Sequence, residues 1–181
     1  NPFHYEKRNS NEISVKNLMM GGENPIRVEL ELNSGLDNEN NIIEEIKKCS
    51  NPKNDIQCEM FHLTITSPED LKKFIKLKEK LSQLGLTPRF ALNCTNEISV
   101  VNDVITHCDK IILTPTHVDL DKMILSAKEK NRPIQWDFSK PHHSKEDFDL
   151  LNYTLHLAEK SGFFLSLVSL TSNDSIHDYR Q

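Results

Sequence analysis

The sequence is poor in the residues that several common classes of protein require. Its 181 residues include only 5 glycines, and neither G-x-G-x-x-G nor G-x-x-x-x-G-K-[ST] occurs. The usual glycine-rich phosphate-binding loops are therefore absent. The 4 cysteines form no C-x-x-C pair, unlike a zinc ribbon or a small disulfide scaffold. No apolar run approaches the ~18 residues that a bilayer-spanning helix needs, so membrane insertion is not expected.

The sequence also lacks an excess of positive charge, because 22 Lys and Arg are outnumbered by 27 Asp and Glu. The formal net charge is -5 and the isoelectric point is about 5.9, which argues against a general nucleic-acid surface. Hydrophobic residues make up 36% of the chain, which suffices for the core of one ordinary domain. We expect Cys49, Cys58, Cys94 and Cys108 to be free thiols in a reducing compartment.

What the sequence does contain is a regular alternation of β-rich and amphipathic segments. The clearest helix signal is Ser67, Pro68 and Asp70, a typical cap and first turn ahead of apolar residues at helical spacing. Strands are predicted at 26–32, 58–65, 89–92, 110–113, 133–138 and 163–170. Helices are predicted at 38–49, 67–85, 97–107, 120–130 and 145–160.

About six βα units predict a parallel sheet built by right-handed crossovers. A doubly wound open sheet and an incomplete (β/α)₈ barrel both fit, and the missing glycine motifs favour the barrel. We therefore predict an α/β, TIM-barrel-like, incomplete parallel barrel at 21–181. An N-terminal extension at 1–20 precedes it, with a hairpin near 13–20. Arg27, Glu29 and Glu31 share one face of the first strand, which fits either an open sheet edge or a polar barrel interior.

Local motifs recur in a recognisable order. They begin with Tyr5, Lys7, Arg8 and Ser10, followed by Gly21-Gly22-Glu23-Asn24-Pro25-Ile26-Arg27-Val28. Further matches lie at 61–66, 88–96, 109–117, 133–139 and 166–180. With this ordered set the chain resembles the N-terminal barrel of 4-hydroxy-3-methylbut-2-enyl diphosphate synthase, the IspG or GcpE family. The resemblance covers nearly the whole chain.

The departures from the family pattern bear on function. The resemblance implies that arginines, asparagines and a lysine at strand ends grip a cyclic diphosphate. The corresponding positions here are His62, Ile112, Thr114, His117 and Gln135, and no lysine follows Lys160. It also implies a four-iron four-sulfur cluster on a C-terminal domain, for which these cysteines lack the spacing. We therefore expect no cofactor on this chain.

The mouth formed by the strand ends is the place to look for a site, because this face carries the chemistry of barrels. The candidate substrate-mouth residues are His62, Asn93, Cys94, Thr114, His117, Gln135, Asp137 and Ser139. Imidazole, thiolate and carboxylate groups among them could ligate a metal, or they could be replacements that the pocket tolerates. We assign no catalytic residue and no metal ligand. A Ser/His/Asp triad near 166–175 lacks a nucleophile elbow.

Loss of the charged contacts predicts a degenerate, non-catalytic barrel that acts as a structural or binding subunit of a larger assembly, a pseudoenzyme. The alternative is a fragment of a divergent synthase of the isoprenoid (MEP) pathway, an oxidoreductase whose iron–sulfur domain is absent from this chain. A third hypothesis is an unrelated open α/β domain, which a non-sequential strand order would establish. We expect a protein partner or a homodimer to cover the open barrel edges. The family's locations imply a plastid stroma or a bacterial cytoplasm.

Overall fold

The computed structural model describes residues 12–51, 53, 57–94, 98–114, 119–137, 149, 152–153, 156, 159 and 166–169. The strands are β1 (Ile13–Val15), β2 (Leu18–Met20), β3 (Glu29–Glu31), β4 (Met60–Ile65), β5 (Arg89–Cys94), β6 (Lys110–Leu113), β7 (Ile134–Asp137) and β8 (Ser166–Ser169). The helices are α1 (Glu39–Cys49), α2 (Pro68–Gln83), α3 (Ile98–His107) and α4 (Leu120–Glu129). Most of the helix predicted at 145–160 lies outside the described residues.

Six strands form one parallel sheet in the order β3-β4-β5-β6-β7-β8. Each strand therefore lies beside its neighbour in the sequence, as right-handed βα crossovers around a barrel require. A doubly wound sheet would reverse its strand order at an internal switch point, and this sheet does not. The predicted incomplete α/β barrel is confirmed, and the unrelated open sheet is excluded.

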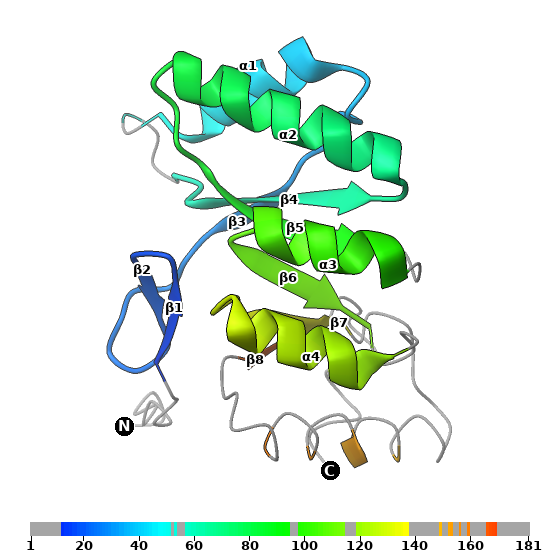
Figure 1. Ribbon diagram of the computed structural model, residues 1–181. Helices are drawn as coiled ribbons and strands as arrows, with labels where there is room; N and C mark the ends of the chain where they lie inside the picture. The colour runs from blue at the N-terminus through cyan, green and yellow to red at the C-terminus, as the bar shows by residue number, and fades with distance from the viewer. Residues whose placement is uncertain are drawn as a thin grey trace, which may run out of the picture.

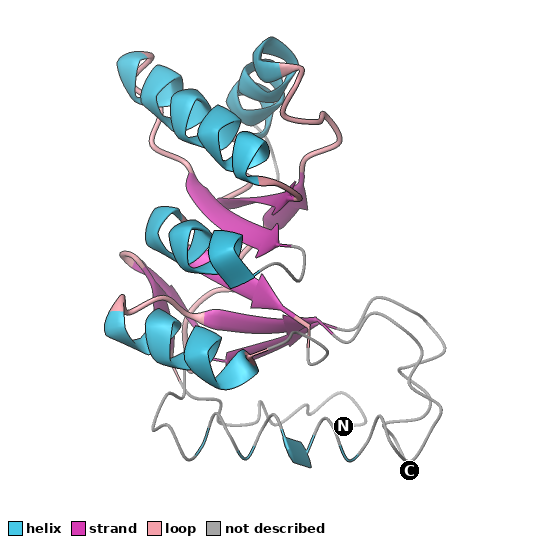
Figure 2. Cartoon of the chain, turned by 45° about the vertical axis from the view of Figure 1, so that its right-hand side comes forward, coloured by secondary structure: helices cyan, strands magenta, loops and turns pink. Residues whose placement is uncertain are grey.

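The four described helices pack on one face of this sheet (Figures 1 and 2). Their buried residues, such as Ile46 of α1, Phe74 of α2, Val104 of α3 and Ile124 of α4, join one hydrophobic cluster. The strands contribute every second residue to it: Phe61, Leu63, Ile65, Phe90, Leu92, Cys94, Ile111, Leu113, Ile134 and Trp136. The helix layer and the sheet therefore share a single continuous core.

The opposite face of the sheet is concave. Lys110 Nζ of β6 donates hydrogen bonds to Glu29 Oε2 of β3 and to Gln135 Oε1 of β7. Two strands, β4 and β5, separate β3 from β6, a spacing of about 14 Å across a flat sheet. Side chains standing perpendicular to a flat sheet would not meet over that distance. The contact exists because the sheet curves round a shared interior.

A small antiparallel hairpin, β1 and β2, closes the end of the half-barrel where the strands begin (Figure 1). Val15 and Leu18 are buried against Met60, the first residue of β4. Asn17 Oδ1 in the turn accepts a hydrogen bond from Arg89 Nη2 at 2.6 Å, and Met19 accepts one from Arg27. The hairpin lies where the sequence predicted one. The division of the chain at residue 20 stays a prediction.

The local signals act as expected at the best-defined helix. Ser67 is the N-cap of α2 and its hydroxyl accepts from the backbone N–H of Asp70 at 3.1 Å. Gly85 follows the helix with a φ of 75°, a conformation that glycine adopts without strain. The first strand of the sheet is shorter than predicted, Glu29–Glu31 in place of 26–32. Among the described helices, none is long and apolar enough to cross a bilayer.

Candidate functional site

Alternate residues of the parallel strands point into the half-barrel and form what we call the concave face. Lys110, Glu29 and Gln135 define this face through their mutual contacts. The strand register places the remaining members beside them: Glu31, Met60, His62, Thr64, Arg89, Ala91, Asn93, Ile112 and Asp137. Thr114 follows β6 directly and falls on the same side by alternation. The concave face is therefore largely polar.

The structure brings most of the predicted mouth residues together. His62, Asn93 and Gln135 lie on β4, β5 and β7 of the same sheet, and each is partly buried. Thr114 and Asp137 lie at the carboxyl ends of β6 and β7. Three positions that the family resemblance linked to the substrate, His62, Ile112 and Gln135, all belong to the concave face. His117 and Ser139 lie outside the described residues.

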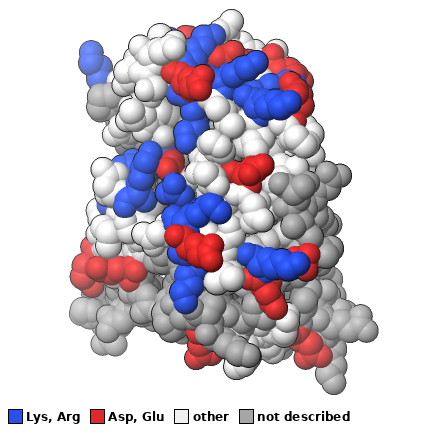
Figure 3. All heavy atoms as spheres, viewed as in Figure 1, with Lys and Arg blue, Asp and Glu red and all other residues white. Residues whose placement is uncertain are grey.

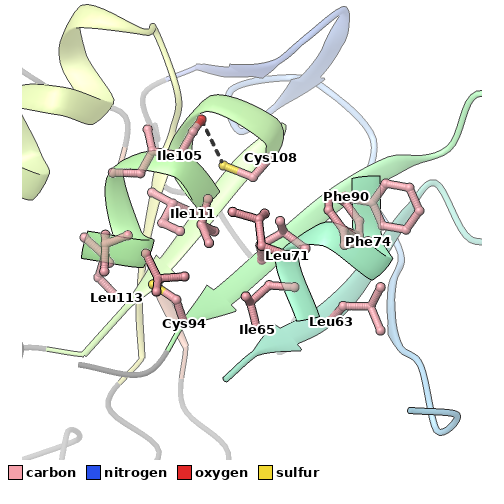
Figure 4. Close-up of a cluster of buried hydrophobic side chains, with 14 of the residues drawn as sticks. Leu63, Ile65, Leu71, Phe74, Phe90, Cys94, Ile105, Cys108, Ile111 and Leu113 are labelled. Carbon is pink, nitrogen blue, oxygen red and sulfur yellow. Dashed lines mark hydrogen bonds between the residues drawn. The ribbon is translucent and has the colours of Figure 1, made fainter. Parts of the chain in front are cut away.

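Cys94 does not belong to this set. It pairs with Ile65 in the register and lies on the helix-facing side, only 3% exposed (Figure 4). Burial raises the pKa of its thiol to about 12, so the thiolate is scarce at neutral pH. The placement of Cys94 at the mouth is therefore corrected. Phe90, Leu92 and Cys94 have the same parity along β5, and this period-two pattern could have revealed it.

The contact between Lys110 and Glu29 is the feature that sequence reasoning missed. The Lys110 side chain is 2% exposed and that of Glu29 is 19% exposed. A buried charge is costly unless it is paired and hydrogen-bonded, and both partners satisfy this rule. Of the two explanations for the charged first strand, Glu29 supports the polar barrel interior. The available signal was a lysine opening the otherwise apolar run Lys110-Ile111-Ile112-Leu113.

The carboxyl half of the concave face is a neutral to acidic surface. In the described part of the chain the cations of the concave face are Lys110, which is paired, and Arg89, and both are the first residues of their strands, away from the carboxyl half. His62 Nε2 is a buried atom with no hydrogen-bond partner among the described residues. A buried polar nitrogen costs roughly 1–3 kcal/mol when it stays unpaired. A ligand oxygen or hydroxyl would satisfy it.

Among the described residues, the helix-covered surface offers no competing charged site. Acidic and basic side chains are intermingled in the view of Figure 3. Several form exposed pairs, such as Lys73 with Asp37 at 2.7 Å and Lys47 with Glu44 at 2.9 Å. The described residues also hold no group of three or more His, Cys, Asp or Glu side chains placed to bind a metal ion. The concave face is therefore the best candidate site.

Known structures place this fold in a class. The chain superposes on phospho-2-dehydro-3-deoxyheptonate aldolase from Thermotoga maritima with a TM-score of 0.61 at 10% identity, over 90% of this chain and 47% of that chain. It superposes on the DHPS of Yersinia pestis with a TM-score of 0.62 at 13% identity, over 94% of this chain and 69% of that chain. With the sequential parallel sheet, these likenesses define an incomplete TIM-type α/β barrel.

The sequence comparisons point to a narrower group of relatives than the structural ones. The chain is 26% identical over 189 residues to a 4-hydroxy-3-methylbut-2-en-1-yl diphosphate synthase (flavodoxin) of Fusobacterium nucleatum, covering 93% of this chain and 50% of that protein. A synthase with the same description from Leptospira interrogans is 23% identical over 114 residues, covering 63% of this chain and 17% of that protein. No family model matches. The chain is thus a strongly diverged IspG-like domain that spans about half, or less, of the length of these relatives.

Proposed function

We propose that the chain is the barrel segment of a divergent 4-hydroxy-3-methylbut-2-en-1-yl diphosphate synthase, and that its concave face contacts the diphosphate substrate of isoprenoid precursor synthesis. One observation carries the proposal. The sequence likeness to the synthase extends over 93% of the chain. Three positions that the family resemblance links to the substrate, His62, Ile112 and Gln135, fall together on the concave face. This supports the synthase segment over a purely structural subunit.

The face is suited to the neutral part of such a ligand. Asn93 and Gln135 carry amides that both donate and accept hydrogen bonds. His62 Nε2, which has no hydrogen-bond partner in the described part of the chain, lies on the same side of the sheet. Ile112 lies between Asn93 and Gln135 in the register and offers an apolar contact. These groups can orient a hydroxylated carbon skeleton, which needs few charges.

The phosphate groups need more than these residues provide. A diphosphate is held by paired Arg or Lys donors, and the described carboxyl half of the face has none. We propose that further residues of a longer protein or a partner chain supply them. The described sheet leaves β3 and β8 as its two edges, and added strands there would complete the barrel wall.

The redox step of the synthase family does not fit this chain alone. Its cysteines would have to place four thiolates round one cluster. Cys94 and Cys108 are instead buried in the helix-side core, and burial raises the pKa of each thiol to about 12. We therefore propose that this segment binds and orients, and that any reductive chemistry belongs to another domain or subunit.

The absence of cations from the described carboxyl half of the concave face favours a second candidate function. In this candidate the barrel keeps its scaffold and has lost the ability to bind the ligand. A thermal melt of the chain with millimolar methylerythritol cyclodiphosphate separates the two. Ligand at 100 times Kd stabilises the folded state by about 2.7 kcal/mol, which raises the Tm of a chain of this size by about 5–10 °C. Inorganic pyrophosphate serves as the control for binding of charge alone.

Single substitutions test whether the ligand binds at the concave face. Asn93→Leu should weaken binding about tenfold or more, because a lost hydrogen bond to a ligand costs about 1–3 kcal/mol. Asn102→Leu on the exposed surface of α3 is the matched control and should keep the wild-type shift. A folded chain that shows no shift with the cyclic diphosphate would contradict the ligand-binding proposal and support the scaffold.

A further inference from the structure

Two of the four cysteines lie side by side at the end of the half-barrel where the strands begin. Cys49 is the last residue of α1, and Cys58 lies two residues before β4. The backbone N–H of Cys58 donates to the carbonyl oxygen of Cys49 at 3.0 Å. Both side chains are half-buried at the edge of the core.

The other two cysteines differ in every respect that governs thiol reactivity. Cys94 and Cys108 are 3% and 1% exposed within the cluster of Figure 4. Cys108 Sγ lies 3.5 Å from the carbonyl oxygen of Ile105 and donates to it. Burial raises the pKa of both thiols to about 12. An oxidant therefore meets two accessible thiols and two protected ones in the same chain.

We propose that Cys49 and Cys58 are a site of reversible disulfide formation, with a low-molecular-weight disulfide such as oxidised glutathione as the co-substrate. The geometry fits. A direct backbone hydrogen bond brings two Cα atoms to about 5–6 Å, as in a paired strand, and disulfides bridge this distance without backbone movement.

The exchange proceeds in two balanced steps. One thiolate of the pair attacks one sulfur of the glutathione disulfide, whose S–S bond breaks and releases one glutathione thiolate. The thiolate of the other cysteine then attacks the protein sulfur of the mixed disulfide and releases the second glutathione. The two protein thiols lose two electrons and two protons, and one glutathione disulfide becomes two glutathione molecules.

Burial, and secondly the neighbouring Cys49, raise the pKa of the Cys58 thiol. Cys58 also lines a cavity of about 300 Å³ with Ser50, Gln57 and Arg89. This opening lets a small disulfide reagent reach Cys58. The bridge would join the end of α1 to the segment entering β4. It lies at the start of the strands, so it is independent of ligand binding at their carboxyl ends.

Peptide mapping of the full chain tests the site directly. The chain is incubated with oxidised glutathione, blocked with N-ethylmaleimide and digested with trypsin without reduction. Trypsin cleaves after Lys53, between the two cysteines, so only a disulfide keeps the two peptides joined. We expect to find this linked pair. The intact chain, weighed before it is blocked, should lose about 2 Da, and its Tm should rise reversibly by about 5–10 °C.

Matched variants sharpen the result. Cys49→Ser and Cys58→Ser should each abolish the linked peptide, whereas Cys94→Ala and Cys108→Ala should keep it. The mapping of the wild-type chain stands even if a core variant fails to fold. Four unmodified thiols, glutathione adducts without a link, or a bridge involving Cys94 or Cys108 would each overturn the proposal.

Discussion

The two faces of the curved sheet are made by alternate residues of the same strands, and they carry different chemistry. The helix-facing side is apolar, with Phe61, Phe90 and Trp136 at no more than 1% exposure. The concave face holds a buried lysine, its glutamate partner and several amides and carboxylates. A strand only six residues long, such as β4, thus serves a hydrophobic core on one side and a polar interior on the other.

This difference in chemistry indicates what each face of the sheet contributes. Closed barrels of this type fill their interior with layers of branched apolar side chains, which makes the interior a second core. Here the helix layer covers the larger hydrophobic cluster. On the concave face Met60 packs against the hairpin, and Ala91 and Ile112 add smaller apolar contributions. Stability should therefore depend mainly on the helix side, and ligand contacts on the other.

The largest effect should come from the helix side. Phe90→Ala removes a fully buried ring whose centroid lies 5.0 Å from that of Phe74, in an edge-to-face arrangement. We expect a loss of about 3–5 kcal/mol in the free energy of unfolding, measured by urea denaturation. Thr64→Ala, on an exposed position of the concave face, is the control and should change it by less than about 0.5 kcal/mol. Equal losses would refute the asymmetry.

A second set of variants tests whether the interior ion pair stabilises the fold or only fixes the positions of its two side chains. Lys110→Met leaves Glu29 half-buried without its cation and should cost about 2–3 kcal/mol. Glu29→Leu alone should cost a similar amount for the same reason. The double variant should recover most of the loss, because an apolar pair removes both desolvation penalties.

Urea unfolding of the four chains gives the coupling free energy directly. Recovery in the double variant would show that the pair is dispensable for stability. If the losses in the free energy of unfolding simply add, the two side chains act separately. The concave face would then contribute more to stability than we expect from the comparison of the two faces.

Much of the fold was predictable because it is encoded locally. Strict alternation predicted the strands, and the Ser67-Pro68 start predicted α2 at its observed position. Consecutive βα units predicted a sequential parallel order, which the sheet has. The rule that consecutive elements pack side by side therefore carried the prediction from the sequence to the sheet.

The candidate site was harder, for two physical reasons. A motif match places Cys94 at the end of a strand but does not say to which face its side chain points, and that face is set by parity along β5. The contact between Glu29 and Lys110 joins residues 81 positions apart. It depends on the curvature of the assembled sheet, which no local pattern of either strand expresses.

The smallest predicted effect lies where the two faces meet. Thr66 follows β4 directly, and Asp70 Oδ2 accepts hydrogen bonds from its hydroxyl and, at 3.1 Å, from its backbone N–H. The Thr66 hydroxyl is the main cause that lowers the pKa of the Asp70 carboxyl, with help from Ser67 and Lys73. This carboxylate therefore ties the carboxyl end of a site-bearing strand to the first turn of the helix that covers it.

The sign of the pH dependence follows from that lowered pKa. The contribution of Asp70 is complete above the unfolded value of about 3.9 and is lost as the pH falls through the lower folded value. Asp70→Asn should cost about 1 kcal/mol at pH 7 and should make the decline of stability below pH 4 shallower. Asp121→Asn, an exposed carboxylate in the first turn of α4, is the control. If both variants lose stability below pH 4 as the wild-type chain does, the link between strand end and helix contributes nothing to stability. The two faces are then coupled only through the strands themselves.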